Sequence, residues 1–383
     1  MKSFPQSLLH KLTQREKGNA LRKLPEPNNR VDFSSNDYLG FSRSEVIFND
    51  THTYLANAGS TNNGATGSRL ISGNHSLYQE TEKVIRQFHK AESALIFNSG
   101  YDANVGLFSS VPQKGDVIVY DEYIHASIRD GMRLSNAKAY KFGHNDLADL
   151  EKRLKNAVIE KSGEVYVVTE SVFSMDGDSP DLKNMTILCE TYNALLIVDE
   201  AHALGVFGEK GEGLVQELNL QDKLFARVMT FGKGLGCHGA AVVGSANLMQ
   251  YLVNFARSFI YTTGLPPHSL ATIHTAYGHL ESNAQNQKSL KDIISFFTSE
   301  IERLKLKSFI KSDSAIHCAV VSGNEKVKNI ASVLQHNGFD VKPILSPTVP
   351  QGDERLRFCL HAYTTQQEVT QVLELLAINH PSS

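Results

Sequence analysis

The chain has 383 residues, enough for a large domain and a second, smaller one. Its 38 Lys and Arg residues nearly balance 41 Asp and Glu residues, so the net charge of −3 argues against a nucleic-acid-binding surface and against an acidic tail. Four widely separated cysteines without a C-x-x-C pair argue against a disulfide framework and a thiolate metal cluster. No apolar run approaches the ~18 residues of a membrane span, and the N-terminus lacks the apolar core of a signal peptide. We therefore expect a cytoplasmic protein whose partners are small molecules and not nucleic acid or membrane.

The first clear element in chain order is an amphipathic helix that starts at Ser76. Ser76 and Gln79 have the spacing of a capping box, which satisfies the first backbone N–H groups of a helix. The apolar positions that follow recur at helical spacing on one face. They are Leu77, Thr81, Val84, Ile85 and Phe88.

Five short apolar runs follow, with room for helices between them. They span residues 94–97, 117–120, 165–169, 195–198 and 228–231. Continuous apolar runs are typical of strands that are buried on both faces of a mostly parallel sheet. The spacing predicts an α/β fold.

From about Ile316 the pattern changes to a smaller module. A strand, "IHCAVV", precedes a helix that Gly338 ends, and a strand over 355–360 precedes a helix over about 369–376. We predict an N-terminal segment over 1–45, a large domain over 46–275 and a small C-terminal domain over 276–383.

A glycine-rich stretch, "TFGKGLGCHGAAVVGS", contains the spacing G-x-G-x-x-G at Gly234, Gly236 and Gly239. A dinucleotide site would need a helix after these glycines and an acidic residue about 20 positions later. Instead an apolar β-branched run follows, and the next acidic residue is Glu281. We therefore predict a strand after Gly239 and interpret the loop as one built around Lys233.

The strand over 195–198 ends in "DEAH", Asp199 to His202. A helicase reading would require a loop G-x-x-x-x-G-K-[ST], which the sequence lacks. Asp199, His202 and Lys233 follow strands whose carboxyl ends meet at the ligand-binding edge of a parallel sheet. The three residue types suit pyridoxal phosphate, because a lysine amine binds its aldehyde and a buried aspartate keeps its ring nitrogen protonated. Taken singly, each also has an ordinary structural interpretation: a surface lysine, a helix-capping aspartate or a core histidine.

A series of motifs resembles the α-oxoamine synthases, which are fold-type I pyridoxal-phosphate enzymes. The resemblance extends from about Leu21 to the C-terminus and implies a large domain with a mostly parallel central sheet plus a smaller α+β C-terminal domain. The motifs, in chain order, are "FSSNDYLG" at Phe33, "GATGSRLISGNHSLYQETE" at Gly64, "NSGYDAN" at Asn98, "HAS" at His125, "TESVFSMDGD" at Thr169, "DEAH" at Asp199, "TFGKGLG" at Thr230, "YTTGLPP" at Tyr261 and "PTVPQGDERLR" at Pro347.

The resemblance implies four catalytic residues. Lys233 is expected to form the Schiff base and Asp199 to pair with the pyridine nitrogen. His202 is expected to meet the phenolate oxygen of the cofactor, and His125 to stack on its ring.

The remaining cofactor-binding residues follow from the same resemblance. Ser99, Gly100 and Tyr101 resemble the phosphate cradle, where backbone N–H groups at a helix start point to an anion. Thr230 resembles a side-chain ligand of the phosphate, and Thr262 resembles the residue that reaches the phosphate from a neighbouring subunit, which implies a homodimer with shared active sites. Two further residues, Glu170 and Ser174, are expected to support the cofactor.

Four residues are expected to bind substrate. Arg357 matches the arginine that holds the amino-acid carboxylate, a task suited to a bidentate guanidinium. Arg22 and Thr348 resemble residues near the acyl substrate, and Asn36, within the first motif, joins this group.

The resemblance implies decarboxylative condensation of L-alanine with a pimeloyl thioester, carried by CoA or by an acyl carrier protein, in biotin biosynthesis. The alternatives are the related glycine-, serine- and succinyl-CoA-using enzymes, namely 2-amino-3-ketobutyrate CoA ligase, serine palmitoyltransferase and 5-aminolevulinate synthase. A non-catalytic subunit with this fold is a further alternative, although it would be expected to lack the lysine. Three positions depart from common family patterns and leave acyl choice and the cofactor loop open: Leu204, His238 and Leu345.

Overall fold

The computed structural model describes residues 4–282 and 284–380 and divides into two compact units. The larger unit comprises residues 36–174 and 178–291. The smaller unit comprises the chain up to Ser35, residues 175–177 and the chain from Asp292 onward. The domain boundaries at 45/46 and 275/276 that we derived from the sequence stay a prediction.

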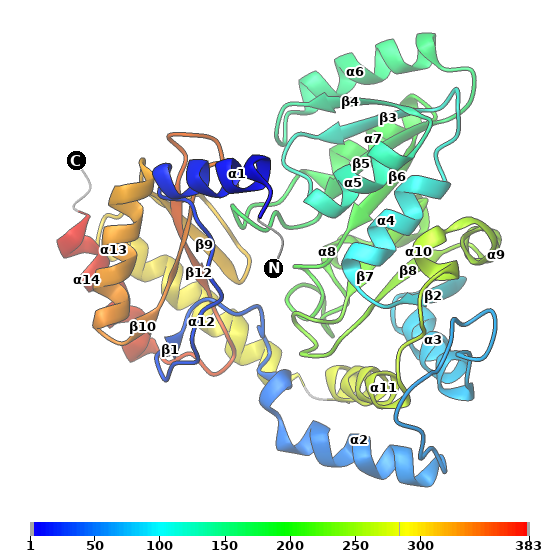
Figure 1. Cartoon of the computed structure of the whole chain (residues 1–383), viewed down its shortest axis with the longest axis horizontal. Helices are drawn as coiled ribbons and strands as arrows, with labels where there is room; N and C mark the ends of the chain where they lie inside the picture. The colour runs from blue at the N-terminus through cyan, green and yellow to red at the C-terminus, as the bar shows by residue number, and fades with distance from the viewer. Residues whose placement is uncertain (1–3, 283, 381–383) are drawn as a thin grey trace. The chain divides into compact units, whose positions relative to one another are not determined.

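A seven-stranded sheet forms the centre of the larger unit (Figure 1). Its strands lie in the order β2-β8-β7-β6-β5-β3-β4, and β8 is antiparallel to both of its neighbours while the remaining pairs are parallel. The predicted mostly parallel sheet and the predicted strand after Gly239 are therefore confirmed. The strands are β2 (Ser93–Phe97), β3 (Val117–Asp121), β4 (Lys138–Phe142), β5 (Val165–Glu170), β6 (Leu195–Asp199), β7 (Ala226–Thr230) and β8 (Ala240–Gly244).

Both faces of this sheet are buried, which is why its strands read as continuous apolar runs. In β3, Ile118 packs into one core, whereas Val117 and Val119 pack into the other. The first core includes residues of α4 (Gly100–Ser110), α5 (Ala126–Leu134) and α9 (Ala246–Phe255), and the second includes residues of α6 (Leu147–Glu160) and α7 (Leu182–Thr191). The other helices of this unit are η1 (Phe41–Arg43), α2 (Glu45–Asn57), α3 (Ser76–Phe88), α8 (Leu214–Glu217), η2 (Gln221–Lys223), α10 (Arg257–Ile260) and α11 (Pro267–Ser282).

Helix α3 corrects one expectation. The helix covers the predicted residues and buries Leu77, Thr81 and Ile85, but its N-cap is His75 and no side chain caps it. Ser76 is already the first helical residue, so the predicted capping box with Gln79 is wrong.

The smaller unit contains a three-stranded antiparallel sheet in the order β11-β12-β9. Its strands are β9 (Ile316–Val320), β11 (Lys342–Ile344) and β12 (Arg355–Cys359), and a separate parallel pair joins β1 (Val31–Asp32) to β10 (Phe339–Asp340). Its helices are α1 (Gln6–Lys17), α13 (Asn324–His336) and α14 (Gln366–Asn379), while α12 (Gln285–Arg303) contains the boundary between the units. Gly338 has a φ of +90° just beyond α13, as expected of a residue that ends a helix.

An imidazole held by two carboxylates follows strand β4. His144 lies 2.9 Å from Asp121 through Nδ1 and 2.9 Å from Asp178 through Nε2. Although burial alone would lower it, these hydrogen bonds and the carboxylate charges raise the pKa of His144 from 6.5 to about 10. The ring is therefore an imidazolium at neutral pH.

The structure also bears on the expected lack of disulfides and of membrane-spanning segments. All four cysteines are free thiols. Throughout residues 4–282 and 284–380, no helix combines the length and the apolar character needed to cross a bilayer.

Candidate active site

Three candidate residues end neighbouring parallel strands of the large sheet. Glu170 is the last residue of β5, Asp199 the last of β6 and Thr230 the last of β7. Glu170 pairs in register with Asp199, and Asp199 with Val228. The carboxyl edge of the sheet therefore gathers these side chains, as predicted for an open α/β sheet.

The loop between β7 and β8 presents Lys233, and its glycines let backbone segments approach closely. A Cβ on Gly234 would overlap the carbonyl oxygen of Leu204, and one on Gly236, whose φ is +60°, would overlap the backbone of Ser42. The loop is closed by a bond from Gly236 N to Lys233 O at 2.8 Å. The glycines thus shape a lysine loop, which agrees with the rejection of the dinucleotide interpretation.

Lys233 begins a chain of hydrogen bonds through the site. Its Nζ lies 2.8 Å from Nε2 of His202, whose Nδ1 lies 2.6 Å from the hydroxyl of Tyr38. The Tyr38 hydroxyl donates to Oδ1 of Asn36 at 3.2 Å. Because that hydroxyl has one proton, it accepts from His202 Nδ1–H, and His202 Nε2 then turns a lone pair toward Lys233. The contacts therefore fix one tautomer of the imidazole.

Asp199 is buried and held by hydrogen bonds on both oxygens. Oδ2 accepts from Asn104 Nδ2 at 2.8 Å, and Oδ1 accepts from the backbone N–H of Ala201 at 2.9 Å. Asn104 Nδ2 also donates to Ser127 Oγ at 3.0 Å. These bonds orient the carboxylate at the end of β6.

His125 and Glu170 are joined at the start of α5. The backbone N–H of His125 donates to Glu170 Oε1 at 2.6 Å, and its Nδ1 lies 2.7 Å from Ser127 Oγ. Desolvation lowers the pKa of His125, with Asp199 opposing and Lys233 adding to the shift. Burial, followed by the charge of Asp199, raises the pKa of Glu170 well above its ordinary value. At neutral pH the His125 ring is thus a neutral imidazole, which suits stacking on an aromatic ligand.

The N-terminus of α4 fits a phosphate group. A Cβ on Gly100 would lie only 2.5 Å from Thr230 Oγ1, so the first turn of α4 packs directly against the end of β7. Ser99 caps the helix, because its Oγ accepts from Asp102 N at 3.0 Å, while the half-exposed Tyr101 donates its hydroxyl to Asp130 at 2.8 Å. An 11-residue helix whose N-terminus meets a threonine hydroxyl is suited to bind an anion.

Two further cofactor candidates, Thr262 and Ser174, lie in loops of the larger unit. Thr262 Oγ1 accepts a hydrogen bond from Asn98 Nδ2 at 3.0 Å. Asn98 directly precedes Ser99, the N-cap of α4. Ser174 is half-buried in the turn after β5. Binding of the neighbouring subunit's phosphate by Thr262 stays a prediction, as does the role of Ser174.

The other three substrate candidates belong to the smaller unit. Arg357 lies in the middle strand β12 and is buried. Arg22 and Thr348 are exposed and meet through a bond from Arg22 Nη2 to Thr348 Oγ1 at 3.3 Å. The structure thus brings together the two residues that we assigned to the acyl substrate, although they are 326 positions apart.

Sequence reasoning missed two residues of this site, Tyr38 and Asn104. Both lie inside motifs that we had quoted, "FSSNDYLG" and "NSGYDAN". The signal that could have identified them is a polar side chain within a segment that packs into the core. Tyr38 has no exposed surface and Asn104 has almost none. A buried polar side chain needs a partner, and here the partners are His202 and Asp199.

The three departures from the family pattern occupy different surroundings. Leu204 is fully buried, so an apolar side chain suits its place. Leu345 is half-buried, and its carbonyl accepts from Thr348 N at 2.8 Å. His238 is exposed, and nothing in the structure explains its presence.

Comparisons with known proteins identify the family. Residues 28–376 match the family model described as aminotransferase class I and II. A protein of Emericella nidulans named 8-amino-7-oxononanoate synthase is 43% identical over 394 aligned positions, which cover 98% of this chain and 96% of the relative.

Two solved structures cover nearly the whole chain. Serine palmitoyltransferase from S. paucimobilis with a bound PLP–myriocin aldimine has a TM-score of 0.87 at 26% identity and covers 97% of this chain and 96% of its own. The 8-amino-7-oxononanoate synthase of Francisella tularensis has a TM-score of 0.78 at 29% identity and covers 92% of this chain and 98% of its own.

Proposed function

The chain belongs to the aminotransferase class I and II family, and on this premise we propose that it condenses L-alanine with a pimeloyl thioester to give 8-amino-7-oxononanoate. The reaction releases carbon dioxide from alanine and the free thiol of the acyl carrier. One observation carries the reaction class: Lys233 Nζ meets His202 at the sheet edge where Asp199 is buried. The choice of substrates follows the 43% identity to the synthase of that name, which extends over 98% of this chain.

The residues at the sheet edge fit pyridoxal phosphate. The N-terminus of α4 and Thr230 would hold its phosphate, Asp199 its ring nitrogen and Lys233 its aldehyde carbon. When bound, this cofactor supplies an electron-accepting ring that stabilises negative charge on the substrate carbon.

Lys233 acts as the general base that removes the Cα proton of alanine and later returns a proton to the product. The task requires a neutral amine at the moment of transfer. His202 turns its Nε2 lone pair toward Lys233 and thereby keeps the lysine nitrogen oriented. Tyr38 and Asn36 hold His202 in that tautomer.

Arg357 binds the carboxylate of the amino acid, because a guanidinium offers two parallel N–H groups to two oxygens. Arg22 and Thr348 contact the acyl substrate. Neither assignment selects among amino acids, so the preference for alanine rests on sequence similarity.

We also propose a homodimer in which Thr262 reaches the partner's cofactor phosphate. Mixing two inactive variants, Lys233→Ala and Thr262→Val, tests this, because one hybrid site would have both residues intact. Recovery of part of the activity supports the shared site. No recovery, or a fully active monomer in sedimentation, would overturn the shared site. Thr262 would then act only within its own chain, where it bonds Asn98. The cytoplasmic location stays a prediction.

The substrate proposal is tested by a parallel assay of alanine, glycine and serine against pimeloyl-, acetyl-, succinyl- and palmitoyl-CoA and a pimeloyl carrier protein. We expect the highest kcat/KM for alanine with a pimeloyl thioester. A higher value for serine with palmitoyl-CoA, or for glycine with acetyl-CoA, would overturn the substrate assignment and leave the lysine chemistry intact.

A further inference from the structure

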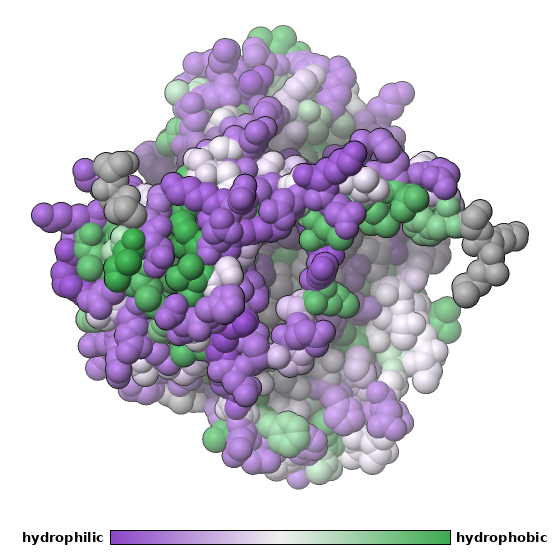
Figure 2. All heavy atoms as spheres, turned by 60° about the vertical axis from the view of Figure 1, so that its left-hand side comes forward, coloured by the Kyte–Doolittle hydropathy of each residue, from purple (hydrophilic) through white to green (hydrophobic). Residues whose placement is uncertain are grey.

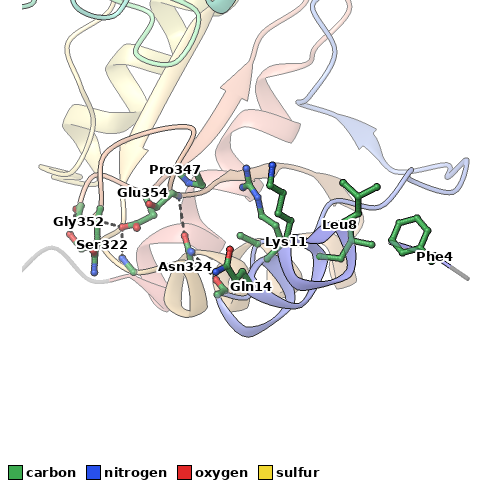
Figure 3. Close-up of a pocket in the computed structure, with 16 residues that line it drawn as sticks. Phe4, Leu8, Lys11, Gln14, Ser322, Asn324, Pro347, Gly352 and Glu354 are labelled. Atoms are coloured by element: carbon green, nitrogen blue, oxygen red, sulfur yellow. Dashed lines mark hydrogen bonds between the residues drawn. The ribbon is translucent and has the colours of Figure 1, made fainter. Parts of the chain in front are cut away.

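A pocket with a cavity volume of about 1180 Å³ lies within the smaller unit. Helix α1 forms one wall, and loops beside α13 and β12 form the other. Figure 3 shows Leu8, Lys11 and Gln14 on the helix side, opposite Asn324 and Pro347. Both walls belong to one compact unit.

One face of α1 supplies apolar and cationic groups together. Leu8, Lys11, Leu12 and Arg15 recur at i, i+3, i+4 and i+7, so they share the face that lines the pocket. The helix has no buried residue, and Leu8 and Leu12 remain 46% and 48% exposed. Figure 2 turns this side of the molecule forward and shows hydrophobic groups set among hydrophilic ones.

The positive charge of this face has no ion-pair partner within residues 4–282 and 284–380. Among the residues that the structure describes, no carboxylate lies within ion-pair distance of Lys11 or Arg15. Glu354, the acidic residue of the lining, accepts from the backbone N–H groups of Gly323 at 2.7 Å and Gly352 at 3.0 Å. The first 30 residues contain seven Lys or Arg and two Glu, although the whole chain has a net charge of −3.

The pocket adjoins the residues that we assigned to the acyl substrate. Asn324 donates to Gly18 O at 3.3 Å and accepts from Ser346 N at 3.1 Å, which fastens the end of α1 to the loop before Thr348. Thr348 in turn bonds Arg22. The pocket wall and the acyl-binding pair are therefore joined by the same loop.

We propose that this pocket binds the phosphopantetheine arm of the acyl carrier, with Lys11 and Arg15 holding its phosphate and Leu8 and Leu12 packing against its apolar part. The inference rests on the proposed function, because a thioester substrate brings such an arm. The cavity exceeds the ~300–1,000 Å³ typical of drug-sized ligands, so it is larger than a short acyl chain needs. CoA and acyl carrier protein present the same arm, so the site suits both.

A basic amphipathic helix is also typical of proteins that bind membrane surfaces. Here, however, the leucines of the cationic face line a pocket whose other wall is protein. A concave site of this kind favours a small ligand over a flat bilayer.

The test measures binding to the cofactor-loaded enzyme by titration calorimetry, without alanine and without turnover. The probes are CoA, 4′-phosphopantetheine, pantetheine without phosphate, and acyl carrier protein that carries the arm. The variant is the double substitution Lys11→Gln with Arg15→Gln. Lys17→Gln is the matched control, since Lys17 lies on the same helix outside the pocket lining. Circular dichroism checks folding, which we expect to be unchanged because α1 buries no residue.

We expect the double variant to weaken phosphopantetheine binding by about tenfold and to flatten its salt dependence, with no change for pantetheine. If the double variant binds CoA and the carrier protein equally less tightly, the pocket accepts the arm from both. If only one of the two binds less tightly, that carrier is the one the pocket accepts. The proposal is overturned if no phosphate-bearing probe changes by more than about twofold, or if pantetheine is weakened equally. Phosphate-dependent binding by an enzyme that turns over no pimeloyl thioester would refute the proposed function and leave the pocket assignment standing.

Discussion

In the larger unit two of the candidate catalytic side chains are buried and held by short hydrogen bonds, whereas in the smaller unit the candidate acyl-binding side chains face solvent. Asp199 and His202 are buried, and each has a partner within 2.8 Å. Arg22 and Thr348 are exposed and share one bond of 3.3 Å. Chemistry that requires fixed geometry lies in packed surroundings, and recognition of a variable acyl group lies where a substitution disturbs little else. The two regions should therefore respond to substitution on different scales.

The largest effect is expected at Lys233. Lys233→Ala should reduce kcat by at least about 10³-fold, because it removes the general base and the covalent anchor of the cofactor. Borohydride reduction and peptide mapping of the wild type should place the pyridoxyl group on Lys233. The exposed Lys223→Ala, in the same unit, serves as the control. A label on another lysine would refute the assignment.

Substitution of Arg357 tests whether a buried residue of the smaller unit has an effect on activity as large as that of the buried residues in the larger unit. Arg357→Leu should cost about 1.5–3 kcal/mol in kcat/KM for every amino acid alike, the scale of a charged hydrogen bond. Arg357→Lys should recover only part of this loss, because an ammonium cannot bind both oxygens in the same fork. Loss confined to the thioester KM would assign Arg357 to the other substrate.

Tyr38 tests whether the bonds around His202 matter to the reaction. Tyr38→Phe removes the hydroxyl that lies 2.6 Å from Nδ1 of His202, so kcat should fall by about tenfold. The pH profile of kcat should shift as well, because the favoured tautomer and the basicity of His202 change. If the pH profile of kcat is unchanged, Tyr38 contributes only to packing. Thermal unfolding of the cofactor-loaded variant controls for lost stability.

Arg22 should show the smaller response of an exposed contact. Arg22→Ala should raise KM for the pimeloyl thioester by about two- to tenfold, since one exposed bond at 3.3 Å is lost. KM for alanine should stay the same. Thr348→Val, which removes the other partner of that bond, is the matched comparison and should give a similar rise. An equal effect on alanine would contradict the division between the two substrates.

The smallest effect on turnover is expected at His144, whose role is structural. The folded-state pKa is about 10 against an ordinary 6.5, so the stabilisation by its two carboxylates is complete below pH 6.5 and is lost as the pH rises through about 10. His144→Gln should lower the free energy of unfolding by about 2–3 kcal/mol at pH 6. Urea unfolding at several pH values checks this, with the exposed His336→Gln as control. If the difference in unfolding free energy between the wild type and His144→Gln does not shrink above pH 10, the charged interaction of His144 with its two carboxylates is contradicted.

The strands of the large sheet could be predicted because burial on both faces leaves a continuous apolar run. That reasoning identified β3, β5 and β6 and the edge of the sheet that Asp199 occupies. The capping box at Ser76 failed because the spacing alone does not say which residue is the first in the helix. Local patterns thus predict elements better than they predict element ends.

The candidate site could be predicted where its residues follow strands, and not where they come from elsewhere. Asn104 lies on α4 and Tyr38 in the loop before η1, so only the packing of these segments on the sheet brings them to Asp199 and His202. The same holds for the contact between Arg22 and Thr348, which closes a separation of 326 positions. The expected roles of Arg22 and Thr348 came from family resemblance and not from local pattern, and Tyr38 and Asn104 were not predicted.

The doubly held imidazole of His144 also changes the electrophoretic character of the protein. The composition gives an isoelectric point of about 6.6 and a net charge of −3 at pH 7 when every histidine is counted as neutral. Since the pKa of His144 is about 10, this side chain adds one positive charge to the folded chain at pH 7 that the count with neutral histidines leaves out. The contribution of His144 therefore raises the isoelectric point of the folded protein relative to that of the unfolded chain. Native and denaturing isoelectric focusing should differ in this direction, and buffers near neutral pH should bring the protein close to its minimum solubility.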